Sequence, residues 1–135
     1  MRFRILRLIA ILFFMNEGIT RQKSYTFALR VVKLHLFLSE TEKEYVLSKQ
    51  LLRCGTAIGA MVCEAEQAES KADFVHKLAI SNKEANEMHY WISLLRDSEL
   101  MDEKLANSFL VDYEELQKLL ISSIKTAKNS IRLKL

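Results

Sequence analysis

The three histidines are the side chains in this sequence best suited to hold a metal or move a proton. A di-iron site in a helical bundle needs carboxylates from two helices and a Glu-x-x-His motif on each of the others. Only Asp73-Phe74-Val75-His76 places an acid three residues before a histidine, and Asp73 fits a helix cap better than a ligand. His35, His76 and His89 have no metal-ligand spacing among themselves. We therefore expect surface or half-buried histidines, no metal and no cofactor.

Motifs for nucleophilic or phosphate chemistry are also missing from the sequence. It has no Gly-x-Ser-x-Gly elbow, no P-loop and no Gly-x-Gly-x-x-Gly fingerprint. Gly55 and Gly59 stand one helical turn apart, but Ala60-Met61 follows them, which indicates a packing motif. Cys54 and Cys63 point to opposite faces of one helix and cannot bridge each other, so we interpret both as buried small hydrophobes in a reducing compartment. These absences predict that the protein is not an enzyme.

Basic side chains offer the remaining chemistry, which is contact with phosphate. The net charge of +3 is carried by Arg2, Arg4 and Arg7, and the rest of the chain is neutral, so bulk charge does not argue for nucleic acid. The local pattern is more informative, because residues 97–115 hold seven acids and one lysine whereas residues 116–135 hold five basic residues and no acid. Such a segment is either a binding tail or a complement to a helix macrodipole. The candidate phosphate-binding residues are Arg30, Lys33, Lys125, Lys128 and Arg132.

The elements that must position these residues are helices. Apolar residues recur at spacings of three and four over about residues 24–38, 42–68, 71–95 and 102–131, and proline is absent. A capping box at Ser70 and Asp73 marks the start of the third helix. Short connections make consecutive helices antiparallel neighbours. We predict an all-α, up-down-up-down four-helix bundle in one domain, with core stripes that include Phe27, Val31, Leu34 and Leu38 on the first helix and Leu51, Cys54, Ile58, Met61 and Ala65 on the second.

The short turns also predict which residues face each other. Because the turn is centred near residues 69–70, two residues that face each other across the antiparallel second and third helices should have residue numbers that sum to about 139. This register places Arg53 opposite Glu84 and Glu87 and predicts an ion pair, the alternative being a solvated arginine. The preceding turn similarly places Gly55 across from Phe27. Two glycines in a helix cost stability, and we expect either a close helix approach or the Phe27 ring lying over them to offset that cost.

Four apolar residues lie outside these core stripes: Leu52, Val62, Trp91 and Leu94. Either the core face is wide, or a second face of these helices is buried against another subunit. We predict that the subunits associate and that these residues supply part of the contact, because the patch would be large for a monomer.

The first fourteen residues form a separate apolar leader with a basic start. The apolar run is too short to span a bilayer, and no clear cleavage site follows its signal-peptide-like regions. A third reading is that translation begins at Met15 and that the leader is an over-extended start. We favour this reading and assign the domain to residues 15–135.

Several runs of this sequence resemble the four-helix-bundle proteins encoded by intervening sequences of bacterial 23S rRNA genes. The resemblance covers about residues 20–100, and where the family often has asparagine this chain has Met61. The runs are Lys23–Val32, Tyr45–Ala60 followed by Glu64-Ala65, Ser70–Phe74, Lys83-Glu84-Ala85 and Tyr90-Trp91.

The resemblance implies a ring-shaped homopentamer. It also implies kinship with the accessory variability proteins of diversity-generating retroelements, which bind a reverse transcriptase and nucleic acid. We therefore predict a cytoplasmic, non-catalytic, oligomeric bundle that binds RNA or a ribonucleoprotein, and neither a membrane nor a small-molecule substrate. The alternative hypothesis is a protein–protein interaction scaffold without nucleic-acid binding, which the neutral charge after Met15 favours.

Overall fold

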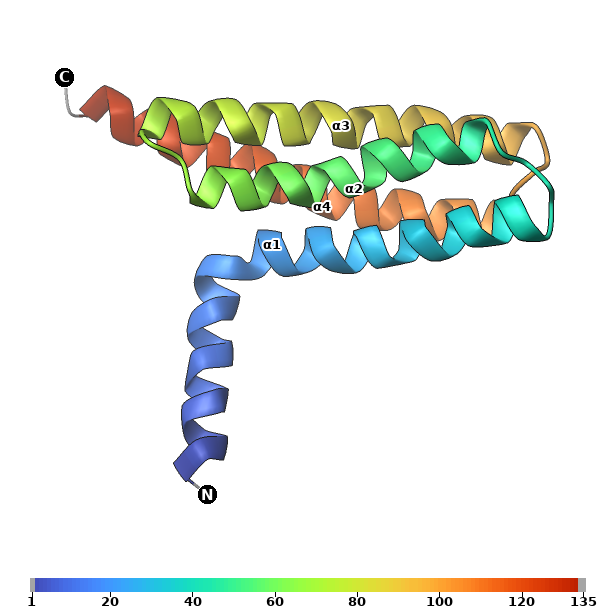
Figure 1. The fold of residues 1–135 in the computed structure, drawn as a ribbon. Coiled ribbons are helices and arrows are strands. Elements are labelled where there is room, and N and C mark those ends of the chain that lie inside the picture. The colour runs from blue at the N-terminus through green and yellow to red at the C-terminus, as the bar shows by residue number, and fades with distance from the viewer. Residues whose placement is uncertain (1, 134–135) are drawn as a thin grey trace.

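Four helices account for most of the chain. The computed structural model describes residues 2–133, with side chains for Arg4 and for residues 18–133. Within this range the helices are α1 (Arg2–Glu40), α2 (Leu47–Glu66), α3 (Lys71–Asp97) and α4 (Glu103–Leu133). Each helix packs against the next and α1 also lies against α4, so the arrangement is an up-down-up-down bundle (Figure 1). The predicted fold class is confirmed.

The first helix is longer than its apolar stripe predicts. The expected start near residue 24 is wrong, because α1 already begins at Arg2. No proline interrupts the segment, and a single glycine inside a helix is tolerated. Figure 1 shows the first part of α1 turning away from the bundle, so that only the remainder packs on the other helices. Apart from Arg4, the side chains of the apolar leader lie outside the described residues. No helix in the described part of the chain is long and apolar enough to cross a membrane.

A carboxylate determines where α2 begins. The expected start near residue 42 is wrong by about one turn, since Lys43 has a left-handed backbone (φ 56°) and α2 starts at Leu47. Glu44 accepts hydrogen bonds from the backbone N–H groups of Val46, Leu47 and Ser48 at 3.0, 2.8 and 2.7 Å. These bonds satisfy donors that a helix start otherwise leaves unpaired. Burial alone would raise the pKa of Glu44, but the backbone hydrogen bonds outweigh it and lower the pKa.

The starts of α3 and α4 follow the sequence more closely. Ser70 caps α3 as predicted, with its hydroxyl accepting from the Asp73 N–H at 3.0 Å. The Asp73 carboxylate accepts from the N–H of Glu69 at 3.3 Å, one residue earlier than in the standard capping box. Asp102 caps α4 by accepting from the N–H of Leu105 at 3.3 Å.

The core lies along the predicted stripes with one exchange. All four predicted core residues of α1 are buried, and on α2 the buried positions include Leu51, Cys54, Ile58 and Ala65. Val62 is only 4% exposed and replaces Met61 in the core. The expectation that Val62 contacts another subunit is therefore wrong. The polar residue Ser81 is also buried, and its hydroxyl donates to the Ile58 carbonyl at 2.8 Å, which joins α3 to α2.

Gly55 and Gly59 allow α1 and α2 to approach closely. A Cβ on Gly55 would lie 2.7 Å from both γ-carbons of Val31, and one on Gly59 would lie 3.3 Å from the Ser24 hydroxyl. Of the two expected compensations, the close helix approach is therefore confirmed. The expectation that Phe27 covers the glycines is wrong, because these contacts fall on the turns on either side of it. The Phe27 ring instead packs edge-on against Phe109 of α4, with centroids 6.0 Å apart.

We predict that Glu44→Gln lowers the free energy of unfolding by about 1 kcal/mol at pH 7, as the loss of a helix cap does. Because the folded protein lowers the pKa of Glu44, this stabilisation is present above the unfolded pKa and is lost as the pH falls through the folded pKa. Denaturant unfolding of both proteins across pH 2–7 checks this. Equal stabilities at pH 7 would contradict the cap.

The two glycines make a matched pair for a second prediction. We expect Gly55→Ala to lower the free energy of unfolding, because overpacking costs about 1–3 kcal/mol and exceeds the gain of about 1 kcal/mol from helix propensity. Val31 cannot easily make room, since a β-branched side chain has few rotamers in a helix. Gly59→Ala is the control and stays within about 1 kcal/mol of the wild type. Equal effects of both substitutions would refute the close approach at Gly55.

Candidate nucleic-acid interface

The histidines do not come together in the structure. His35 Nδ1 lies 3.2 Å from the Ser48 carbonyl, which links α1 to the start of α2. His89 stacks at a tilt on Tyr113 of α4, with centroids 5.4 Å apart, while His76 is exposed. Among the residues that the structure describes, no three His, Cys, Asp or Glu side chains are grouped as metal ligands would be. The two histidines with contacts thus serve helix packing.

The two cysteines differ in their surroundings. Cys54 is fully buried. Burial is the main cause that raises the pKa of its thiol to about 12, and the nearby negative charge of Glu87 raises it further. Cys63 is exposed, so its interpretation as a buried hydrophobe is wrong. Both thiols are free, and their placement on opposite faces of α2 follows from the spacing of nine residues. Cys54 is too protonated and too buried to act as a nucleophile.

Arg53 joins α2 to α3 at the register that the turn predicts. Its guanidinium lies 3.2 Å from the Glu84 carboxylate and also pairs with Glu87. Glu87 accepts a further hydrogen bond from the Trp91 indole N–H at 3.1 Å. The arginine is half exposed, so the pairs contribute modestly to stability and chiefly mark the alignment of the two helices.

Arg30 does not belong to a free basic surface. Its guanidinium pairs with Asp112 and donates to the Ser108 hydroxyl at 3.1 Å. It also lies 4.1 Å from the centre of the Phe109 ring, a cation–π contact. Arg30 therefore attaches α1 to α4, and its expected role in phosphate binding is replaced by a structural one.

Lys33 is exposed but lies far from the other candidates. The contacts of Arg30 with Asp112 and of Phe27 with Phe109 show that the residue numbers of facing partners on α1 and α4 sum to about 139. Lys33 therefore faces about residue 106, some 19 residues before Lys125, which is about 28 Å along the helix axis. The structure does not bring the α1 and α4 candidates together.

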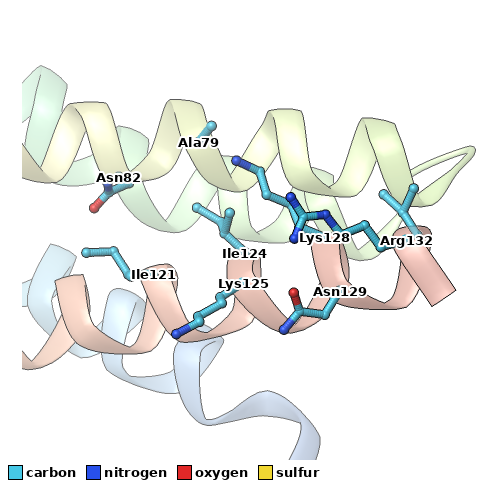
Figure 2. A pocket seen from close by; sticks show the side chains of 9 residues that line it. Ala79, Asn82, Ile121, Ile124, Lys125, Lys128, Asn129 and Arg132 are labelled. Carbon is cyan, nitrogen blue, oxygen red and sulfur yellow. The ribbon is translucent and has the colours of Figure 1, made fainter.

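Lys125, Lys128 and Arg132 do share one site. They lie along one side of a groove of about 740 Å³ between the C-terminal half of α4 and the first half of α3. All three side chains are exposed, and none of the ion pairs among the described residues includes them. Figure 2 shows Lys128 and Arg132 reaching from α4 toward α3, whereas Lys125 points away from α3. We call these three residues and the groove beside them the basic groove.

The opposite wall of the basic groove was not predicted. It is formed by Ala79 and Asn82 of α3, and the remaining lining residues of α4 are Ile121, Ile124, Asn129 and Ile131. The Asn82 Oδ1 atom is shielded from solvent and has no hydrogen-bond partner among the described residues. No motif distinguishes Asn82 in the sequence, and only the α3–α4 register would have brought it to this groove.

The exposed apolar surface lies on a different helix from the one expected. Leu52 and Trp91 are partly buried against the core, which leaves only Leu94 of the four candidates as an exposed residue. On α1, by contrast, the outer face carries exposed apolar side chains at spacings of four, three and four. This α1 outer stripe consists of Tyr25, Leu29, Val32 and Leu36, which are 65%, 46%, 37% and 46% exposed. The same helical spacing that revealed the core stripe would have revealed this one.

Comparison with known proteins assigns the chain to a family. Residues 17–122 match the family described as 23S rRNA-intervening sequence protein, so Lys125, Lys128 and Arg132 lie beyond the matched region. A crystal structure of a protein of unknown function from the S23 ribosomal protein family of Bacteroides thetaiotaomicron VPI-5482 is 50% identical in sequence. It superimposes with a TM-score of 0.80 and covers 82% of this chain and 99% of its own. No curated protein matches the sequence. The chain therefore belongs to the 23S rRNA-intervening sequence protein family.

Proposed function

We propose that this protein is a non-catalytic, cytoplasmic, oligomeric helical bundle that binds RNA or a ribonucleoprotein through the basic groove. The observation that carries the proposal is the group of three exposed cations at the end of α4 that lack carboxylate partners among the described residues. Along the middle of the bundle, by contrast, Arg30 and Arg53 are held by acids of neighbouring helices. Unpaired cations on one helix face are available to the phosphates of an RNA strand.

The position of these cations argues against a purely helix-capping role. The macrodipole acts on charges within the last turn of a helix. α4 ends at Leu133, so Arg132 lies in its last turn, but Lys128 and Lys125 lie one and two turns earlier. Complementing the dipole explains Arg132 alone. The three residues span about 10 Å along the axis, a length that reaches more than one phosphate.

The family supports the proposal through its name only. Its members are named for intervening sequences of 23S rRNA, which places them in a genetic setting with an RNA. The matched solved structure is described as a protein of unknown function. The proposal therefore depends on the charges of this chain, and it assigns no metal, cofactor or small-molecule substrate to the protein.

A second proposal concerns self-association, and the α1 outer stripe favours it. Four exposed apolar side chains aligned over three helical turns form a seam of the kind that helices bury against each other. A copy of the same chain is the partner that we propose, in a ring that the resemblance expects to be pentameric. Association through this stripe leaves the groove between α3 and α4 open, so an oligomer and an RNA-binding protein are compatible readings.

For RNA binding we predict that replacing Lys125, Lys128 and Arg132 by glutamine weakens the binding of structured RNA by at least tenfold at low salt. The magnitude of the slope of log affinity against log salt falls by about two to three, because each of the three lost phosphate contacts removes about 0.7–0.9. Fluorescence anisotropy over a salt series measures both quantities. Lys49, Lys83 and Lys104, also exposed, provide a control with the same change in charge. RNA binding that is undetectable at low salt, or that both triple variants weaken equally, would refute the proposal.

For self-association we predict that a chain starting at Met15 forms an oligomer that Leu29→Glu and Val32→Glu together dissociate. Light scattering at micromolar concentration gives the mass of each protein. Leu94→Glu is the matched control, since it also places a charge at an exposed leucine but on α3. A monomer mass for the unmodified chain, or dissociation caused by Leu94→Glu alone, would contradict the α1 seam.

A further inference from the structure

The end of the bundle that holds the α1–α2 and α3–α4 turns is hollowed and acidic. The hollow has a volume of about 660 Å³, and its apolar lining includes Phe37 and Leu105, which are 45% and 37% exposed. We call it the acidic end hollow. Its charged lining residues are one arginine, Arg96, and five acids, which are Glu42, Asp97, Glu99, Asp102 and Glu103.

Most of this negative charge is not neutralised within the chain. Arg96 pairs with Asp97 at 3.0 Å. The ion pairs among the described residues include none of the exposed acids Glu42, Glu99 and Glu103. The acidic end hollow therefore combines exposed apolar side chains with uncompensated carboxylates. A partner that is both apolar and positively charged complements it.

The opposite end of the bundle carries a projecting helix end with this complementary chemistry. Lys71 is the first residue of α3 and donates to the Ser130 hydroxyl, so the last turn of α4 extends past α3 (Figure 1). Leu133 lies in this turn and is 88% exposed. Lys128 and Arg132 precede it on α4, and both are exposed and absent from the ion pairs of the described residues.

These two surfaces of one chain are too far apart to meet each other. The acidic end hollow lies at the first turn of α4, whereas Leu133 lies at its last. α4 has 31 residues and is therefore about 46 Å long. Only the end of α4 from another copy of the chain can enter the hollow.

We infer that the acidic end hollow of one copy takes the end of α4, residues 128–133, of a second copy. Leu133 packs on the apolar lining, and Lys128 and Arg132 pair with the free acids. Because the contact joins opposite ends of the bundle, it is heterologous and adds copies in a row. It does not use the α1 outer stripe and does not depend on RNA binding. It shares two cations with the basic groove, so a second copy and RNA exclude each other there.

Sedimentation velocity without RNA tests the contact on the full-length chain. The substitutions Leu29→Glu and Val32→Glu in every sample remove association through the α1 outer stripe. At low salt we expect the mean mass to rise from one chain to several as the concentration increases through the micromolar range. Salt at about 1 M should reverse the rise, because it shortens the Debye length to about 3 Å.

Charge reversal at either end should abolish this rise. One variant carries Glu42→Lys and Glu99→Lys, and the other carries Lys128→Glu and Arg132→Glu. Each variant alone presents like charges at the contact and should keep the mass of one chain. An equimolar mixture of the two restores opposite charges at every contact and should recover the rise. Recovery on mixing also shows that neither variant has lost its fold.

A matched control reverses two acids outside the hollow. Glu69 and Glu114 are exposed and absent from the ion pairs of the described residues, and changing both to lysine should leave the rise unaltered. A mass that does not rise at low salt would overturn the contact. So would a rise that survives reversal at one end, or a mixture of the two variants that keeps the mass of one chain.

Discussion

The contact between Gly55 and Val31 is the constraint on which the arrangement of α1 depends. The Val31 methyl groups occupy the space that any side chain at position 55 would fill. α1 and α2 can therefore approach this closely only because position 55 is glycine. This approach fixes how far α1 is shifted along α2. The shift in turn places Arg30 beside Asp112 and Phe27 against Phe109, which is how α1 reaches α4 and closes the bundle.

The same alignment decides which charges remain free. The acids in the first half of α4 lie beside basic residues of α1, as in the pairs of Arg30 with Asp112 and of Lys23 with Glu115. Toward the C-terminal half of α4 the first part of α1 turns away from the bundle (Figure 1). The basic end of α4 consequently has α3 beside it, and none of the ion pairs among the described residues joins it to an acid of α1. In the first half of α4 the acids are therefore neutralised by basic residues of α1. In its C-terminal half the basic side chains remain available to bind an anion.

Periodicity and turn length were sufficient to predict most of the fold. The core stripe of α1, the cap at Ser70 and the position of Arg53 opposite Glu84 all follow from spacing and short turns. The boundary errors arose where a side chain or backbone conformation overrides the pattern, as at Glu44 and Lys43. Val62 was misassigned because Met61 and Val62 are adjacent, and periodicity alone does not decide which of two neighbours faces the core.

The candidate site was predictable only in part, because it combines residues of two helices. The three cations of α4 stand out as an acid-free segment, but Asn82 and Ala79 have no signal of their own and are brought to the groove by packing. Arg30 looked equivalent to those cations in the sequence, and only the partner helix shows that it is engaged.

The central claim is that RNA contacts the groove between α3 and the basic end of α4. Ultraviolet cross-linking of the full-length protein to bound RNA, followed by tryptic digestion and mass spectrometry, tests it most directly. The account predicts nucleotide adducts on the peptides 119–125 of α4 and 78–83 of α3, which include Ile121, Ile124 and Asn82. Adducts confined to peptides of α1 and α2, with none on these two, would contradict it.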